Sequence, residues 1–145
     1  MNAKVNQTTV KNIKRLYLLM NKQIEKELKK YNLARSQFQV IYYTHQGGEI
    51  SQKELVKLMQ VEPATLTVII DGLVKKGILK RKENKDDKRS NVIELTAIGD
   101  QVRKKIPSIG EILERQMFQK VSKTDITITT KTIERMIHNL EPVEE

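Results

Sequence analysis

Basic side chains gather in one short segment of this sequence. Between residues 75 and 89 the chain carries eight basic residues against three acidic ones, a local balance of +5, whereas residues 121–145 have a balance of −2. The basic residues are Lys75, Lys76, Lys80, Arg81, Lys82, Lys85, Lys88 and Arg89. Clustered Lys and Arg side chains bind polyanions because they release counterions condensed on phosphates. The segment therefore predicts contacts with the phosphates of a nucleic acid.

Other kinds of chemistry find few residues to support them. The chain has no cysteine, which excludes disulfides, thiolate metal ligands and a thiol nucleophile. His45 and His138 lie in separate elements, and neither has a second histidine at helical ligand spacing, so we expect no metal site and interpret both as polar packing residues. With no phosphate-cradling glycine loop and no catalytic triad, the sequence predicts a protein that is not an enzyme and holds no cofactor.

Two short helices are predicted immediately before the basic segment. Ser51 followed by Glu54 forms a capping box that opens a helix over residues 51–59, with Leu55, Leu58 and Met59 facing inward. After a turn at residues 60–62, Pro63 suits the first position of a second helix over residues 63–76. That helix is expected to bury Leu66, Ile69, Ile70 and Leu73, and Gly77 ends it. This pattern is typical of a helix-turn-helix.

The basic segment itself is predicted to be a β-hairpin. Residues 78–82 and 89–95 have extended character, with Ile93 and Leu95 on one face, and residues 83–88 form a charged loop without apolar side chains. A hairpin placed directly after the second helix of a helix-turn-helix is a wing. The sequence therefore predicts that the basic residues lie on a wing beside a helix that can enter a DNA groove.

Longer helices flank this central part. Apolar residues at steps of three and four predict a helix over residues 8–31, one over 35–45 that Gly47 and Gly48 end, and one over 97–120 capped by Thr96. Pro107 kinks or splits the last of these. A final helix follows Ser122, although Thr and Ile between residues 126 and 133 also allow a strand. The first helix is longer than a small domain needs, so part of its apolar stripe is expected to pack on another chain.

The predicted fold is mainly α with a small β wing: a winged helix-turn-helix with N- and C-terminal dimerisation helices. We expect a single domain over residues 1–145, with the winged helix-turn-helix at 35–95 and the dimerisation helices at 1–31 and 97–145. The longest apolar run, residues 16–20, is too short to span a bilayer, and the first ten residues lack the apolar core of a signal peptide. A cytoplasmic, nucleoid-associated protein is therefore expected.

Two motifs resemble those of the MarR (multiple antibiotic resistance regulator) family. The segment DKRSNVIELT at residues 87–96 is similar to that family's wing signature, in which Asp, any residue and Arg precede Leu-Thr by five residues. The segment LTVIIDGLVKKGI at residues 66–78 is similar to its recognition helix and the exit from it, and Gly99 stands where the family usually has glycine. The order of predicted elements matches over essentially the whole chain.

The resemblance implies a homodimer whose two winged modules contact successive major grooves of a pseudo-palindromic operator. It also implies repression of transcription that a small anionic or phenolic effector relieves. Three positions depart from the family pattern: Val68 and Gly72 stand where relatives commonly have Arg, and Glu62 stands where Ser is favoured as a cap. Base recognition is therefore expected to depend less on Arg, and the operator cannot be inferred from a relative.

The DNA-binding residues expected from these patterns fall in three groups. The first turns of the recognition helix face base edges, Arg89 enters the minor groove while Asp87 pairs with its guanidinium, and lysines of the wing contact phosphates with help from the start of the preceding helix. The full set is Ser51, Gln52, Pro63, Ala64, Thr65, Thr67, Val68, Lys80, Lys82, Lys85, Asp87, Lys88 and Arg89.

Two questions stay open on the sequence alone. Tyr17, Phe38, Tyr42 and Tyr43 are candidates to line an effector cavity, but packing in the core explains them equally well. Winged helices also serve as protein-interaction or RNA-binding modules, and such a module would bind duplex DNA weakly and without sequence preference.

Overall fold

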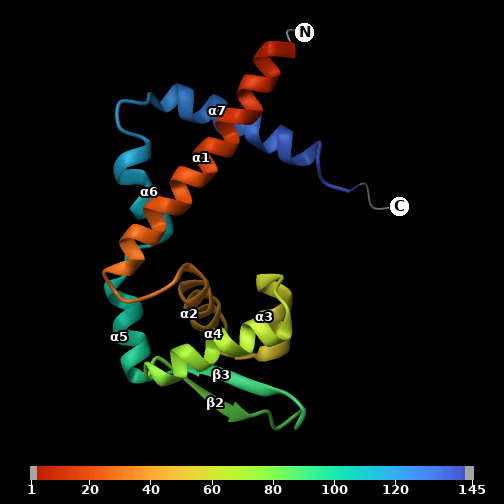
Figure 1. Ribbon diagram of the computed structural model, residues 1–145, viewed down its shortest axis with the longest axis vertical. Coiled ribbons are helices and arrows are strands. Elements are labelled where there is room, and N and C mark those ends of the chain that lie inside the picture. Colours follow the sequence, from red (N-terminus) through yellow and green to blue (C-terminus); the bar gives the residue numbers. More distant parts are fainter. Residues whose placement is uncertain (1–2, 143–145) are drawn as a thin grey trace.

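A computed structural model describes residues 3–142 of the chain. The elements in order are α1 (Ala3–Lys29), α2 (Arg35–Gly47), β1 (Glu49–Ser51), α3 (Gln52–Met59), α4 (Pro63–Lys75), β2 (Leu79–Glu83), β3 (Asn91–Leu95), α5 (Ala97–Lys105), α6 (Ile109–Met117) and α7 (Lys123–His138). Figure 1 shows α2, α3, α4 and the hairpin gathered in one lobe, from which α1, α6 and α7 extend. The predicted winged helix-turn-helix with flanking helices is confirmed.

One aliphatic core holds the lobe together. It joins the end of α1 to α2, α3, α4 and the sheet, and its fully buried side chains include Leu28, Ile41, Leu55, Leu66 and Ile93. Because apolar burial is worth roughly 25 cal/mol per Å² removed from water, this core is the main source of the lobe's stability. The lobe is thus a rigid support for the surface loops.

The sheet has three antiparallel strands in the order β1-β3-β2, one strand more than the sequence predicts. Ile50 of β1 pairs with Ile93 of β3, and Leu79 of β2 pairs with Leu95. β1 is not predicted from the sequence, because three residues after Gly48 are too few to show an alternating pattern. β1 attaches the start of α3 directly to the wing.

Pro107 splits the segment predicted as one helix over residues 97–120. Ile106 adopts the extended conformation that a following proline favours, with φ −87° and ψ 121°. Ser108 then caps a new helix, and its hydroxyl accepts a hydrogen bond from Glu111 N at 3.1 Å. The result is α5 and α6 with a break between them.

The alternative of a strand at residues 126–133 is wrong, because α7 covers this segment. Ser122 caps the helix by accepting from Asp125 N at 3.0 Å. Thr127, Thr130 and Thr132 donate their hydroxyls to carbonyls four residues earlier, at 2.8–2.9 Å. These bonds accommodate threonine within a helix despite its preference for strands.

Several smaller expectations need correction. The first helix begins at Ala3 rather than Thr8. Leu58 does not face the core, since 49% of it is exposed at the end of the short helix α3. His45 and His138 are exposed surface residues rather than packing residues, and His138 lies 3.6 Å from Glu141.

Candidate nucleic-acid interface

The helix-turn-helix consists of α3 and α4, and its local geometry follows the sequence signals closely. Ser51 Oγ accepts from Glu54 N at 3.1 Å, and Glu54 Oε2 accepts from Ser51 N at 3.1 Å, so the capping box is confirmed. The hydrogen bonds from Ser51 lower the pKa of Glu54. Gln60 takes a left-handed conformation with φ 53°, which ends α3 and turns the chain into α4. Pro63 occupies the first helical position, as predicted.

One face of the first two turns of α4 is open to solvent. The exposed residues are Pro63, Ala64, Thr65, Thr67 and Val68, and 71% of Val68 is exposed. On the opposite face Leu66, Ile70 and Leu73 are buried. All five residues predicted to face base edges therefore lie on one exposed surface, which is the geometry that a recognition helix requires.

Thr67 and Gln52 also have a structural task that sequence analysis does not predict. Thr67 Oγ1 donates to Pro63 O at 3.0 Å and accepts from Gln52 Nε2 at 2.8 Å. The single proton of the Thr67 hydroxyl is thereby used within the protein. These bonds fix α3 against α4, so any contact from Thr67 to a base is restricted to accepting a hydrogen bond.

The wing loop is organised differently from expectation. Asp87 Oδ1 accepts from the backbone N of Arg89 at 3.0 Å, and Ser90 N donates to Asp87 O at 3.0 Å. No ion pair between Asp87 and the Arg89 guanidinium is present within residues 3–142. A short Asp side chain reaches the amide two residues on more easily than the end of a long arginine. Asp87 therefore shapes the turn and leaves the guanidinium exposed.

Lys80 and Lys82 form an ion-pair network on the outer face of the sheet. Lys80 Nζ lies 2.5 Å from Glu94 Oε1, while Lys82 Nζ lies 2.7 Å from Glu94 Oε2 and 3.1 Å from Glu49 Oε1. These hydrogen bonds lower the pKa of Glu94 to about 2 and raise the pKa of Lys82. Cross-strand pairing of Lys80 with Glu94 explains the arrangement. Two of the four lysines predicted to contact phosphates, Lys80 and Lys82, thus have carboxylate partners in the free protein.

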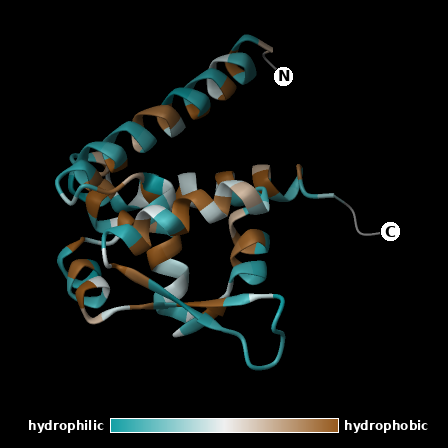
Figure 2. Ribbon diagram, turned by 60° about the horizontal axis from the view of Figure 1, so that its bottom comes forward, coloured by the Kyte–Doolittle hydropathy of each residue, from teal (hydrophilic) through white to brown (hydrophobic). Residues whose placement is uncertain are grey.

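Lys85 and Lys88 remain exposed in the loop between β2 and β3, and within the described residues neither ammonium has a carboxylate partner. Figure 2 shows this loop as a hydrophilic extension of the sheet. The ammonium groups of Lys85 and Lys88 are therefore available to phosphates, and the loop, which also carries Asp86 and Asp87, keeps a small net positive charge.

A groove of about 600 Å³ is lined by predicted DNA-binding residues from different elements. Gln52 and Pro63, from the starts of α3 and α4, line it together with Asp87 and Arg89 of the wing. Lys53, Val56, Ser90 and Asn91 complete the lining. Neither Lys53 nor Asn91 is predicted from the sequence, because Asn91 is one of the five unspecified positions between Arg and Leu-Thr in the wing signature, and Lys53 is an unspecified position inside the capping box. Lys53 could be found only from its place beside Gln52 at the start of a capped helix.

The structure also bears on metal and effector sites. Among the described residues no group of three or more His, Asp or Glu side chains could hold a metal ion. A groove of about 700 Å³ runs between α1 and α6, and none of Tyr17, Phe38, Tyr42 or Tyr43 lines it. Tyr42 and Tyr43 instead contact each other edge to face, with ring centroids 5.6 Å apart.

No helix in residues 3–142 combines the length and apolar character needed to cross a bilayer.

Comparison with known proteins identifies the family. The sequence profile of the MarR family matches residues 33–91, which run from α2 through the loop of the wing. The multiple antibiotic resistance protein MarR of Escherichia coli K12 is 25% identical over 132 residues, covering 88% of this chain and 90% of that protein.

Solved structures agree on the fold. AbsC, a MarR family transcriptional regulator from Streptomyces coelicolor, superposes with a TM-score of 0.82 at 17% identity, covering 97% of both chains. A mutant of E. coli MarR that was crystallised with operator DNA superposes with a TM-score of 0.73 at 23% identity, covering 91% of this chain and 92% of that one. The chain belongs to the MarR family and is a helix-turn-helix DNA-binding transcriptional regulator.

Proposed function

We propose that this regulator is a ligand-responsive repressor that binds a pseudo-palindromic operator as a homodimer, acting at the nucleoid. The observation that carries the proposal is the juxtaposition of an exposed face on α4 with the exposed guanidinium of Arg89 across one groove. A helix and a cationic loop spaced in this way can occupy neighbouring grooves of one duplex.

Base recognition is assigned to the start of α4. Ala64 and Val68 offer methyl groups for contact with thymine, and Thr65 offers a hydroxyl that can donate or accept. Thr67 supports this surface through Gln52 and can add one acceptor. The chemistry of these side chains favours operators rich in A·T pairs at the centre of each half-site.

Affinity is assigned mainly to the wing and to α3. Arg89 enters a narrow minor groove, where the negative potential is strongest. Lys85 and Lys88 contact phosphates beside it, while Ser51, Gln52 and the additional residue Lys53 contact the backbone from the start of α3. Lys80 and Lys82 join them only when phosphates compete successfully with Glu49 and Glu94.

Dimerisation is assigned to the two ends of the chain. Of the described residues of α1 only Ile24 and Leu28 are buried, and α7 buries none. Apolar side chains on both helices are exposed, among them Val10 (68%) and Ile137 (53%). Exposed apolar stripes of this length mark an interface. A second copy of this chain fits best, because the exposed apolar stripes of one copy can then cover those of the other.

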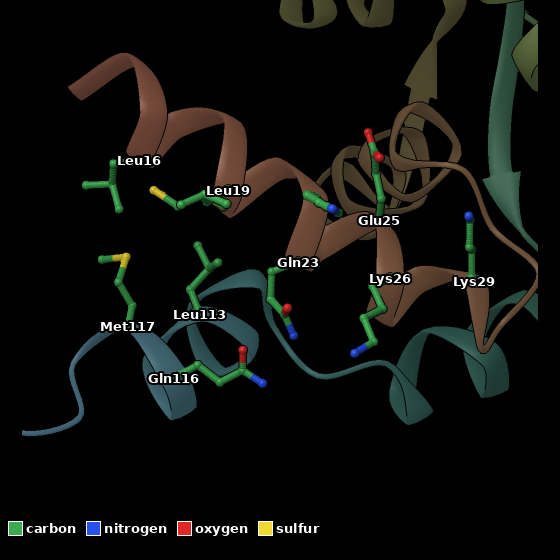
Figure 3. Close-up of a pocket in the computed structure, with 11 residues that line it drawn as sticks. Leu16, Leu19, Gln23, Glu25, Lys26, Lys29, Leu113, Gln116 and Met117 are labelled. Carbon is green, nitrogen blue, oxygen red and sulfur yellow. The ribbon is translucent and has the colours of Figure 1, made fainter. Parts of the chain in front are cut away.

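Effector binding is assigned to the groove between α1 and α6. Figure 3 shows Leu16 and Leu19 of α1 facing Leu113 and Met117 of α6, with Lys26 along the same groove. Lys22 and Lys29 also line it, and Glu25 is its one acidic residue. An apolar wall with excess positive charge suits a small aromatic anion or a phenolate. Occupying the groove would shift α1 relative to α6 and so change the spacing of the two winged modules.

The proposal is tested by selecting bound fragments from the source genome with purified protein. We expect a small set of fragments that share a pseudo-palindrome, bound by one dimer each and at least 10³-fold more tightly than random duplex, with affinity falling steeply as salt rises. Uniform weak binding to all duplexes would instead support a non-specific or RNA-binding module. Benzoate and benzamide, added to the operator complex, then test whether an anion is needed for release.

A further inference from the structure

Two short connections join the winged lobe to the helices that leave it. Residues 30–34 link α1 to α2, and residues 106–108 link α5 to α6. The first connection is tied to the end of α5, where the second connection begins, because Tyr31 OH donates to Lys105 O at 3.0 Å. A change in the angle between the lobe and α1 would move these two segments and repack Ile24 and Leu28 at the buried end of α1.

A third tie connects the first of these segments to the end of the recognition helix. Lys76 follows the last residue of α4, and its ammonium donates to Gln37 Oε1 at 3.0 Å and to the carbonyl of Asn32. Asn32 lies in the turn after α1 with φ 54°. The bonds span 39 and 44 residues of sequence, so they hold α4 to the α1–α2 turn from outside the core.

Gln37 makes this tie rigid. Its Oε1 also accepts from Ala34 N at 3.1 Å, which fixes the amide at the start of α2. A Cβ at Gly72 would lie 3.0 Å from Gln37 Nε2, so α4 approaches this amide closely. Leu33, only 4% exposed, anchors the turn itself in the core. Lys76 therefore contacts a fixed point on the scaffold rather than a loose loop.

We infer that Lys76 is a positioning residue that sets the angle of the recognition helix to α1, and thereby the distance between half-sites that the dimer accepts. The inference rests on the proposed function, since it needs two winged modules held by one dimer. Lys76 lies at the opposite end of α4 from the residues assigned to base contacts, so its effect is transmitted along the helix.

The length of α4 turns a small rotation into a change of register. Its 13 residues span about 20 Å. A tilt of about 10° at Lys76 would therefore move Pro63 by about 3 Å, which is close to the spacing of successive base pairs along DNA. A tilt of this size is enough to make half-sites one base pair closer or farther apart acceptable.

The test compares Lys76→Met with the matched control Lys75→Met in the full-length protein. Both substitutions remove one positive charge and keep a long apolar side chain, but the ammonium of Lys75 has no partner among the described residues. An operator is first obtained with the wild type by selection from random duplexes. Affinities are then measured for that operator and for variants with one base pair added or removed between half-sites, together with the dimer mass in solution.

We expect the wild type and Lys75→Met to prefer the selected spacing by the same factor. Lys76→Met should stay dimeric, and its affinity ratio between the selected and the altered spacings should be about tenfold smaller than that of the wild type. The reason is that a hydrogen-bonded charge no longer fixes the angle. Lys76→Arg, which can donate to the same two acceptors, should restore it. Equal spacing profiles for Lys76→Met and Lys75→Met would overturn the inference alone. A wild type that is monomeric or has no spacing preference would overturn the proposed function and the inference with it.

Discussion

Arg81 Nη2 lies 2.6 Å from Asp71 Oδ1 and so joins β2 of the wing to α4. The two side chains are 27% and 49% exposed, respectively, so the pair is partly shielded from solvent at the junction of hairpin and helix. Asp71 is on the third turn of α4, behind the residues assigned to base contacts. The pair therefore fixes the wing at one distance from the recognition helix.

Breaking this ion pair should lower the affinity for operator DNA while changing the free energy of unfolding only slightly. Arg81→Met is expected to lower operator affinity several-fold, while stability changes by at most about 1 kcal/mol, as for other solvent-accessible pairs. Asp71→Asn should give a similar loss of affinity, measured by titration of labelled operator at fixed salt. If Arg81 instead contacts DNA directly, Asp71→Asn would leave affinity unchanged or raise it, which would contradict the positioning role.

Gly99 is required because of a close approach between α5 and the chain after α4. A Cβ at residue 99 would lie 2.1 Å from the carbonyl oxygen of Ile78, a backbone atom that cannot move aside. Gly99→Ala should therefore destabilise the protein by about 2 kcal/mol or more in urea unfolding. Gly110→Ala is the matched control: its nearest neighbour would be Ser108 Oγ at 3.8 Å, so helix propensity should stabilise it by up to about 1 kcal/mol. Equal effects at the two glycines would refute the steric explanation.

The helix-turn-helix, the wing and four of the residues that begin or end their helices could be predicted because each has a local sequence cause, whereas the left-handed Gln60 that ends α3 could not. Ser51, Pro63, Gly77 and Thr96 act on their own turns, so short-range chemistry determines them. Pro107 alone does not decide between a split and a kink, since a proline can also kink a continuous helix. Sequence reveals that outcome only through Ser108 and Glu111, a capping box that marks a new helix start.

The partners of the wing residues were harder to predict than their positions. Asp87 and Arg89 are two residues apart, and sequence does not decide whether the carboxylate reaches the guanidinium or the amide. The pairing of Lys82 with Glu49 depends on β1, a strand too short to recognise, which lies 33 residues away in sequence. Ion pairs across a sheet follow from register, and register is set by the whole fold.

Arg89 and Lys85 should contribute to DNA binding in different ways. Arg89→Ala is expected to lower operator affinity about tenfold or more and to reduce discrimination against G·C pairs where the wing contacts the minor groove. Lys85→Ala should weaken operator and random duplex equally and reduce the salt slope by about 1, as for loss of one phosphate contact. Both variants should remain dimeric. Unchanged operator affinity of Arg89→Ala would reject the role assigned to it.

Stability at low pH should depend on Glu94. Contact with Lys80 and Lys82 lowers the pKa of Glu94 to about 2, below the ordinary value of about 4.3 that the unfolded chain retains. A lowered carboxylate pKa stabilises the folded state above about pH 4.3, and this stabilisation disappears as pH falls towards 2. Unfolding free energies of the wild type and Glu94→Gln should therefore differ at pH 6 and converge near pH 2. A difference that stays constant over this range would show that titration of Glu94 does not contribute.

The same substitution should strengthen binding to DNA of any sequence. Glu94 accepts from both Lys80 and Lys82 in the free protein, so phosphates must displace a carboxylate before they can bind these ammonium groups. Glu94→Gln removes that competitor and also one negative charge near the wing, so affinity for random duplex should rise several-fold with a salt slope steeper by about 1 to 2. Glu83→Gln is the matched control: it removes the same charge from β2 without freeing a lysine, since Glu83 has no ion-pair partner in residues 3–142. It should leave the salt slope unchanged. Because the gain adds phosphate contacts rather than base contacts, operator and random affinity should rise by the same factor and their ratio should stay unchanged. A salt slope for Glu94→Gln equal to that of Glu83→Gln would mean that Lys80 and Lys82 do not reach phosphates when DNA is bound.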